Sequence, residues 1–208
     1  KFGGSSVGNA VQFMKVMAII HNNARMKYVV VSAPAGITDI LYGVADGGKH
    51  GLSRDALLKL VEERFRGIVC GLGFEHVFDL ASHMRDLHKA AAKRPCDTEY
   101  IVSRGEYINA RILACVMHCS FVDSVKFVRF SDKGIYDPRA TAGLGKEQLA
   151  HRIGRCIIPG FYGAQPDGSI KLFGRGGSDL TASIVANVVL FSEMPRLPPC
   201  VVRSWMYV

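Results

Sequence analysis

The chain has 208 residues, of which 49% are hydrophobic and 21% charged. This composition is typical of one globular domain and excludes disordered, collagen-like and coiled-coil proteins. Basic residues outnumber acidic ones by 26 to 18, and the net charge of +8 suits anionic substrates. Because the basic residues are interleaved with acidic ones and no apolar run is long enough to span a bilayer, we expect neither nucleic acid nor a membrane as a partner.

Strand-like and helix-like segments alternate along the sequence. In chain order, the predicted elements are a strand ending at Phe2, a helix over 10–20, a strand over 28–31, helices over 53–69, 75–93 and 98–118, a strand-like segment over 121–130, a helix over 146–153, a strand over 156–158, a hairpin turning at 166–168 and a helix over 178–190. Asn9 and Thr98 are the expected N-caps, Ser53 opens its helix, and Pro95 closes the helix before it. The alternation predicts an α/β sandwich with a mostly parallel sheet, in which ligands lie at the carboxyl ends of strands.

Cysteine usage and the first residues bear on the compartment. The six cysteines are irregularly spaced, and the sequence opens without the apolar stretch of a signal peptide, so we expect reduced thiols in a cytoplasmic protein. It also opens without a methionine, so we expect further residues before Lys1. Cys115, His118 and Cys119 could share one helical face, but their neighbours are apolar and a fourth ligand is missing. We therefore expect no metal site.

The first glycine loop follows the strand that ends at Phe2. Gly3 and Gly4 allow backbone N–H groups to turn towards a phosphate, and Lys1 adds a positive charge. The lysine precedes the glycines, so this is not a Walker loop. A simple tight turn explains the same residues nearly as well.

A second loop follows the buried strand over 28–31. Ser32 and Thr38 place two hydroxyl groups around a Pro-Ala-Gly turn at the end of this strand. Thr38 could equally be no more than the N-cap of the next helix.

The third loop gives the strongest indication of a ligand. Three glycines and Arg175 directly precede the helix over 178–190, where unpaired backbone amides favour an anion. A glycine turn with Ser178 as the N-cap is the alternative, but it does not explain an arginine between glycines. We favour an anion site, because the guanidinium offers a two-point contact to carboxylate or phosphate. Glu106 lies inside a predicted helix, where a glutamate is usually solvated, so the residues alone give it little functional weight.

Four motifs in a fixed order carry a family resemblance. They are KFGGSSVG at 1–8, VVVSAPAGITD at 29–39, SRGEYINARILA at 103–114 and IIPGFYGAQPDGSIKLFGRGGSDLTASIVA at 157–186. Together they resemble the hallmarks of the aspartokinases, which have the amino-acid kinase fold, and IIPGFYGAQPDGSIK is most similar to bacterial single-function aspartokinases. KFGGSSV combined with SRGE separates this pattern from the related acetylglutamate, carbamate and uridylate kinases.

The resemblance implies a three-layer αβα sandwich and an aspartate kinase. The family reaction transfers the γ-phosphoryl group of ATP to the side-chain carboxylate of L-aspartate, giving 4-phospho-L-aspartate, the first step of lysine, threonine and methionine biosynthesis. It implies ATP with Mg²⁺ as co-substrate, no tightly bound cofactor, and homo-oligomers for full-length members. The aspartate side chain is already anionic at neutral pH, with an ordinary pKa of about 3.9, so no general base is required.

The resemblance also implies roles for particular residues. Lys1 would stabilise the transferring phosphoryl group, and Asp179 would orient Lys1. Glu106 would pair with the ammonium group of aspartate and Arg175 with its α-carboxylate. The remaining residues would line the aspartate pocket (Ser32 and Thr38) or contact phosphate oxygens (Gly3, Gly4, Ser5, Gly176, Gly177 and Ser178).

The end of the sequence departs from the family pattern. Residues 188–208 lack the Thr-Asp pair and the Asp-Gly turn with which the family holds its nucleotide. We interpret residues 1–187 as the aspartate-binding N-terminal part of a kinase domain, truncated on the nucleotide side, and 188–208 as an atypical tail. We expect the chain alone to be incomplete as a catalyst. A non-catalytic remnant and a kinase for another small acid remain as alternatives.

Overall fold

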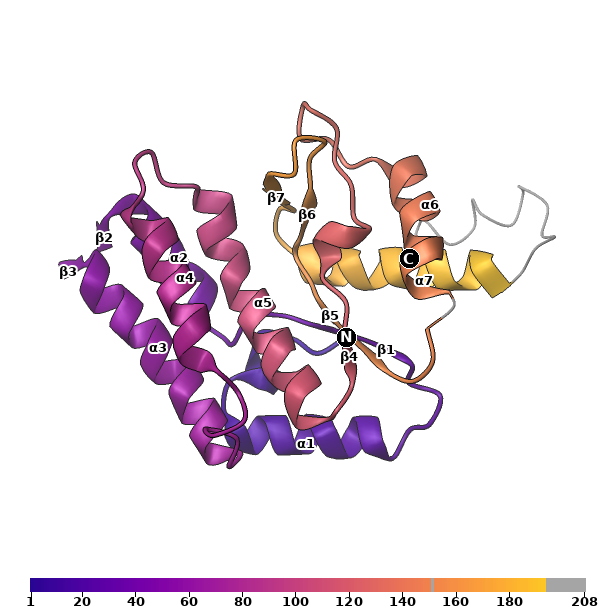
Figure 1. Cartoon of the computed structure of the whole chain (residues 1–208), viewed down its shortest axis with the longest axis horizontal. Coiled ribbons are helices and arrows are strands. Elements are labelled where there is room, and N and C mark those ends of the chain that lie inside the picture. The colour runs from indigo at the N-terminus through magenta and orange to yellow at the C-terminus, as the bar shows by residue number, and fades with distance from the viewer. Residues whose placement is uncertain (151, 194–208) are drawn as a thin grey trace.

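The computed structural model describes residues 1–150 and 152–193 (Figure 1). The helices are α1 (Ala10–His21), α2 (Ile37–Asp46), α3 (Arg54–Gly71), α4 (Leu80–Ala92), α5 (Thr98–Val116), α6 (Pro138–Leu149) and α7 (Gly177–Glu193). The strands are β1 (Tyr28–Val31), β2 (Gly48–Lys49), β3 (Leu52–Ser53), β4 (Ser120–Phe121), β5 (Cys156–Pro159), β6 (Tyr162–Ala164) and β7 (Ile170–Leu172). Two short 3₁₀ helices, η1 (Gly4–Val7) and η2 (Ser124–Lys126), complete the described elements.

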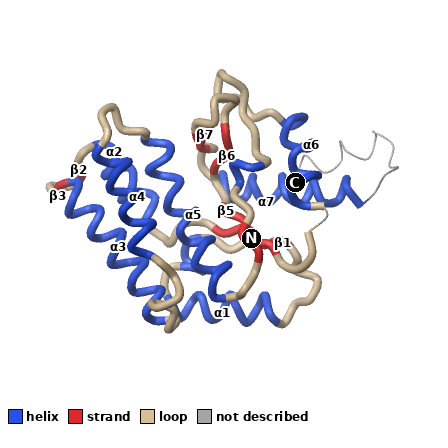
Figure 2. The backbone as a smooth tube through the Cα atoms, viewed as in Figure 1, coloured by secondary structure: helices blue, strands red, loops and turns tan. Residues whose placement is uncertain are grey.

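A short parallel sheet lies at the centre of the molecule (Figure 2). β5 is its middle strand, with β1 on one side and β4 on the other, both parallel to it. Phe2 extends the sheet beyond β1 through a parallel bridge to Val31, so the predicted first strand is confirmed at this one residue. The predicted hairpin is also confirmed, because β6 and β7 pair antiparallel around the turn at 166–168.

The two faces of the sheet belong to different hydrophobic cores. Val29, Val31 and Ile157 pack into a core shared with α1 to α5, whereas Val30 and Ile158 pack into a second core shared with α6 and α7. This division follows from the alternation of side chains along a strand. Figure 1 shows the same arrangement, with α2 to α5 gathered on one side of the sheet and α6 and α7 on the other. The predicted α/β sandwich with a parallel sheet is confirmed.

Several helix starts were predicted correctly from capping residues. Asn9 and Ser53 accept hydrogen bonds from backbone N–H groups three residues later and cap α1 and α3. Two other starts were wrong. Asp97, and not Thr98, caps α5, and Asp79 caps α4, so the expected helix over 75–93 begins only at Leu80.

Two predicted segments were wrong in larger part. Within 121–130 only Phe121 belongs to a strand, because Asp123 caps the 3₁₀ helix η2 and turns the chain. The helix predicted over 146–153 ends at Leu149, and its first residue is Pro138, which follows the capping side chain of Asp137. Residue 151 and residues 194–208, which include Cys200, lie outside the described part of the chain. The boundary predicted at 187, between the kinase part and the tail, falls inside α7.

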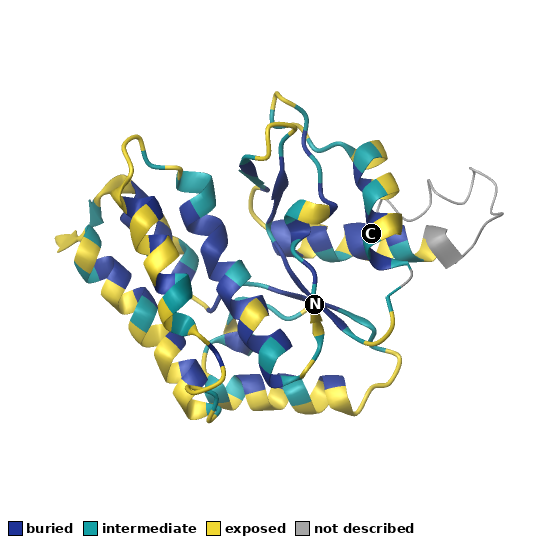
Figure 3. Cartoon of the chain, viewed as in Figure 1, coloured by how far each residue is buried: buried dark blue, intermediate teal, exposed yellow. Residues whose placement is uncertain are grey.

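Helix α5 is the most buried helix of the described chain (Figure 3). Thirteen of its residues are buried, including the unbroken run from Ile101 to Glu106. The charged side chains inside this run, Arg104 and Glu106, are therefore held in a low-dielectric environment. No helix among residues 1–150 and 152–193 combines the length and the hydropathy that a membrane span needs.

Candidate active site

Four segments meet at the carboxyl ends of the parallel strands. The loop at Phe2–Gly4 touches the loop that follows β1, where the N–H of Ala35 donates to the carbonyl of Gly4 at 3.1 Å. The segment that follows β5 joins them, because the N–H of Gly160 donates to the carbonyl of Val31. The same segment packs against the start of α7. The three loops singled out in the sequence are thus brought to one edge of the sheet, where α/β proteins bind ligands.

Lys1 and Asp179 form an ion pair at this edge. Nζ of Lys1 lies 2.9 Å from Oδ1 of Asp179, and the Lys1 side chain is only 20% exposed. The same ammonium group lies 3.9 Å from the position that a Cβ atom would take at Gly3. The Lys1 ammonium group therefore lies between Asp179 and the backbone of Gly3, which has no side chain. Ser5 is exposed in η1, next to this cation-bearing loop.

Gly4 is required by a close approach of two backbones. A Cβ atom there would lie 2.8 Å from the carbonyl oxygen of Ala33 and 3.1 Å from the nitrogen of Ala35. Because both neighbours are backbone atoms, no side-chain rotation can relieve the contact.

We expect Gly4→Ala to destabilise the fold by about 1–3 kcal/mol, because the methyl group must push the first two loops apart. The matched control is Gly67→Ala, since Gly67 is an exposed position inside α3 with nothing within 4 Å of an added Cβ. This control should stabilise the chain by about 0.5–1 kcal/mol. Urea denaturation of both variants measures the two effects. Equal midpoints for Gly4→Ala and the wild type would contradict the close approach.

The third glycine loop is held against the segment that follows β5. Gly176 has a φ angle of +76°, and its carbonyl accepts the N–H groups of Asp179 and Leu180 as α7 begins. Thr181 donates its hydroxyl to the carbonyl of Gly177 and accepts from the N–H of Phe161. Ser178 is the second residue of α7 and not its N-cap, so the alternative explanation of Ser178 as a cap was wrong. Its side chain packs against Gly160 instead.

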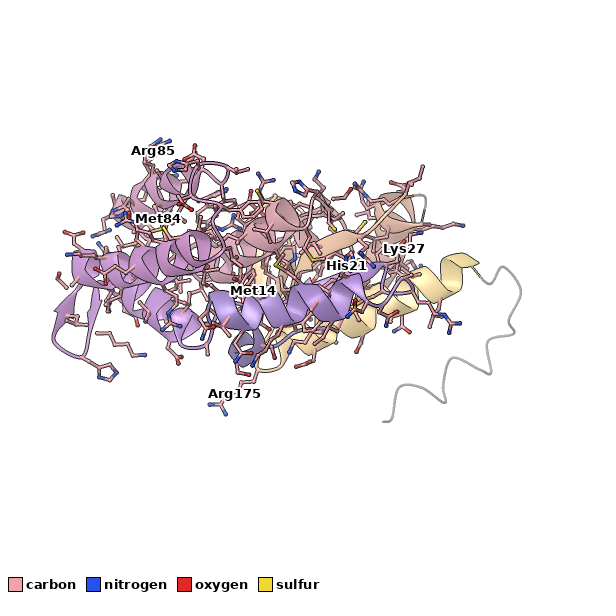
Figure 4. The ribbon with its side chains drawn as sticks, turned by 90° about the horizontal axis from the view of Figure 1, so that it is seen from below. Met14, His21, Lys27, Met84, Arg85 and Arg175 are labelled. Carbon is pink, nitrogen blue, oxygen red and sulfur yellow. The ribbon has the colours of Figure 1, made fainter. Side chains whose placement is uncertain are left out.

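Arg175 stands apart from the other expected site residues. Its side chain is exposed and, in Figure 4, projects away from the body of the chain. The flanking Gly174 and Gly176 have nothing within 4 Å of an added Cβ, so the loop that carries Arg175 is open on both sides.

The second loop places its two hydroxyl residues differently. Ser32 is half-buried, and its N–H donates to the carbonyl of Phe2, so it lies beside the first loop. Thr38 is also half-buried but is the second residue of α2. The position before this helix is taken by Gly36 with a φ angle of +83°, so Thr38 is not an N-cap.

Glu106 is buried, contrary to the ordinary expectation for a helical glutamate. It is 3% exposed, and burial raises the pKa of its carboxyl to about 8. A backbone hydrogen bond from Ala33, at the end of β1, and the positive charge of Arg104 act in the opposite direction but are weaker. The approach of α5 to this loop is possible because residue 105 is glycine, whose added Cβ would lie 2.9 Å from the Cβ of Ala33. Glu106 thus places a carboxyl group beneath the second loop.

The buried carboxyl group predicts a pH-dependent stability. Between the ordinary pKa of 4.5 and about 8, the folded chain keeps a proton on Glu106 that the unfolded chain has released. The free energy of unfolding therefore falls as the pH rises through this window. Between about pH 5 and pH 8, we expect the free energy of unfolding of the wild type to fall relative to that of Glu106→Gln, by at most about 5 kcal/mol. The Tm of the wild type should fall with it. Melting curves recorded across this pH range measure the effect, and Glu63→Gln, at an exposed site, is the control. If the Tm of the wild type and that of Glu106→Gln changed with pH in the same way, the burial of Glu106 would be contradicted.

Sequence reasoning missed a polar cluster around Glu106. The guanidinium of Arg104 is buried over the rings of Tyr100 and Tyr107, at 4.4 and 4.3 Å from their centroids, and donates to the hydroxyl of Ser103. Asn109 is fully buried and donates from Nδ2 to the carbonyl of Ser32 at 2.7 Å. Asn109 follows Glu106 by three positions in a helix, and this spacing is the signal that could have identified it.

The cysteine cluster is arranged differently from the helical face considered above. α5 ends at Val116, so Cys119 lies beyond the helix that carries Cys115. Burial raises the pKa of the Cys119 thiol, which contacts the carbonyl of Met117. Among the described residues, no three His, Cys, Asp or Glu side chains gather closely enough to hold a metal ion.

Comparison with known proteins finds a family model and several relatives that this chain is similar to. Residues 1–190 match the amino acid kinase family. The sequence is 31% identical over 212 residues to the lysine-sensitive aspartokinase 3 of Escherichia coli, covering 93% of this chain and 47% of that protein. It is 30% identical over 205 residues to aspartokinase 3 of Bacillus subtilis, covering 90% and 45%. The chain spans about half the length of these relatives.

Solved structures of similar proteins have the same fold. Aspartate kinase of Clostridium acetobutylicum superposes with a TM-score of 0.82 at 35% sequence identity, over 91% of this chain and 44% of that one. Aspartokinase III of E. coli, solved in complex with aspartate and ADP, superposes with a TM-score of 0.83 at 29% identity, over 91% and 46%. The three-layer α/β fold expected from the motifs is confirmed by these superpositions.

Proposed function

We propose that this chain, which belongs to the amino acid kinase family, forms the aspartate-binding part of an aspartate kinase. The observation that carries the proposal is that a buried carboxyl group, Glu106, and the Lys1–Asp179 ion pair lie at the same edge of the parallel sheet, where its strands end. Such a site offers one partner for an ammonium group and one cation for a phosphoryl group. The relatives support the proposal, since one of them was solved with aspartate and ADP.

The proposed chemistry needs positioning more than proton transfer. A side-chain carboxylate oxygen of L-aspartate forms a bond to the γ-phosphorus of ATP, while the bond from that phosphorus to the β–γ bridging oxygen breaks and ADP leaves with the electron pair. The nucleophile is already ionised, so the protein must hold two anions in line and offset their repulsion. Lys1 is placed to offset negative charge on the moving phosphoryl group. Mg²⁺ enters with ATP as part of the co-substrate.

The other site residues take the roles that the family resemblance implies. Glu106 binds the ammonium group of aspartate, and Ser32 and Thr38 line the pocket from the second loop. Asp179 holds Lys1 in position through their ion pair. Backbone groups of the first and third loops contact phosphate oxygens; these are at Gly3, Gly4, Ser5, Gly176, Gly177 and Ser178.

Arg175 is proposed to bind the α-carboxylate of aspartate, which requires its side chain to turn inward from its exposed position. We expect Arg175→Lys to weaken L-aspartate binding by about 2–3 kcal/mol, because an ammonium group cannot replace a planar two-point contact. Arg139→Lys, at an exposed position of α6, is the matched control. Calorimetric titration measures both variants, and an unchanged affinity for Arg175→Lys would remove Arg175 from the site.

The function is tested by titrating the chain with L-aspartate, L-glutamate and N-acetyl-L-glutamate, and by assaying aspartate-dependent release of ADP from Mg·ATP. Saturable binding with a preference for L-aspartate is the expected result. Preference for another acid would favour a different kinase of the same fold. Aspartate binding without ADP release, in a hybrid that adds the C-terminal half of the E. coli relative, would favour a binding protein that has lost the chemistry. Absence of L-aspartate binding would overturn the proposal.

A further inference from the structure

Two buried polar atoms on α5 lack a hydrogen-bond partner. They are Oε2 of Glu106 and Oδ1 of Asn109, and within residues 1–150 and 152–193 no other buried side-chain nitrogen or oxygen is in this state. Glu106 is 3% exposed and Asn109 is fully buried. Buried polar atoms in native proteins are almost always paired, so two left unpaired indicate a missing partner.

The two acceptors lie on one face of the helix and against one loop. Residues three apart in a helix are neighbours on its surface, with Cβ atoms about 5–6 Å apart. Asn109 donates from Nδ2 to the carbonyl of Ser32, and Glu106 is hydrogen-bonded by the backbone of the next residue, Ala33. The two side chains therefore bond to neighbouring residues of the loop that follows β1.

The hydrogen bond to Ser32 determines how the Asn109 amide lies. Nδ2 is 2.7 Å from the carbonyl oxygen, and exchanging the two ends of the amide would set oxygen against oxygen at that distance. Oδ1 is therefore the atom left for another partner. The nearby cation Arg104 does not supply it, because its guanidinium is stacked on Tyr100 and Tyr107 and donates to Ser103.

We propose that Oδ1 of Asn109 and Oε2 of Glu106 together accept hydrogen bonds from the ammonium group of the amino-acid substrate. An ammonium group has three donors and no acceptor, so it can satisfy both atoms at once. Asn109 is then a substrate-binding residue that selects acids carrying an amino group. This inference rests on the proposed function, because it assumes that the substrate enters at Glu106.

The selection for amino acids follows from the polar atoms that an acid without an amino group would leave unpaired in the site. Succinate has both carboxylates of aspartate but no amino group, so Oδ1 of Asn109 and Oε2 of Glu106 would both stay buried without a partner. Sites built to hydrogen-bond a polar group of the substrate strongly reject analogues that lack it. A role limited to holding the Ser32 carbonyl would instead affect both acids equally.

The test is a calorimetric titration of the full 208-residue chain with L-aspartate and with succinate. Asn109→Leu should weaken L-aspartate binding at least tenfold and leave succinate binding within about twofold. Asn109→Ala removes the same amide without adding bulk, so it should lower the ratio of L-aspartate to succinate affinity at least fivefold. Asn187→Leu, at an exposed position of α7, is the matched control and should change neither affinity.

The outcomes separate this inference from the function on which it rests. A parallel loss of both ligands in Asn109→Leu, or an unchanged ratio in Asn109→Ala, would overturn the role of Asn109 and leave the proposed function standing. A wild-type chain that binds no L-aspartate would overturn the proposed function itself. Thermal melting shows which variants are folded, and if Asn109→Leu is unfolded, the ratio in Asn109→Ala decides.

Discussion

Glu106→Gln is expected to weaken the binding of L-aspartate at least 100-fold, which corresponds to about 3 kcal/mol. Glu106 is buried beneath the loop that follows β1, where little water can screen a charge. Once L-aspartate binds, its ammonium group stabilises the ionised carboxylate, and glutamine offers an amide of similar shape without that charge. The loss is large because the substrate cation would then be desolvated without a counter-charge.

The measurement is a titration of both chains with L-aspartate at two pH values. Wild-type affinity should rise between about pH 6 and pH 8, because binding must displace the proton from a carboxyl whose pKa is about 8 in the empty site. The affinity of Glu106→Gln should not follow pH in this way. Glu63→Gln, on the exposed face of α3, controls for the loss of one negative charge. An affinity of Glu106→Gln within about fivefold of the wild type would remove Glu106 from the substrate site.

Lys1→Ala is expected to lower kcat by about 10²–10³ and to leave the KM for aspartate nearly unchanged. The Lys1 ammonium group is mostly shielded from solvent by its position over Gly3 and its ion pair with Asp179. Its charge matters most when negative charge shifts among the phosphoryl oxygens in the transition state. Removing it should therefore slow the chemical step much more than it weakens substrate binding.

The effect is measured in the steady-state kinetics of a hybrid enzyme. In this hybrid, residues 1–187 are joined to the C-terminal half of the E. coli aspartokinase. Lys59→Ala, an exposed lysine of α3, is the matched control and should keep the wild-type kcat. Asp179→Asn should lower kcat less than Lys1→Ala does, because it releases the cation without removing it. A kcat for Lys1→Ala within about threefold of the hybrid's own value, less than about 1 kcal/mol of barrier, would show that Lys1 has another role.

The fold was predictable wherever a local signal and the tertiary structure agreed. Asn9 and Ser53 precede segments whose apolar residues recur at helical spacing, and both cap helices. The segment 121–130 misled because its apolar residues suggested a strand, whereas the side chain of Ser124 hydrogen-bonds the carbonyl of Pro159 and holds the chain in η2. That contact joins residues 35 positions apart, so no local pattern contains it.

The site was predictable as a set of loops but not as an arrangement of side chains. The glycine loops were identified from residue type, and their meeting at one edge follows from the parallel sheet. The burial of Glu106 could not be read from the sequence, because it depends on Ala33 and Gly105 allowing two elements to touch. Arg175 shows the opposite case, since its neighbours suggested an inward anion ligand and its side chain is exposed.

The pairing of β1 with β5 has a consequence for how the chain is made. Tyr28 pairs with Cys156, so during synthesis β1 has left the ribosome long before its partner strand exists. The core formed by α1 to α5 consists mainly of residues that precede β5 and can assemble earlier. We therefore expect the nascent chain to pass through a stage in which a helical core is formed while one edge of β1 stays unpaired. Only after Pro159 emerges can the central strand enter and close the sheet.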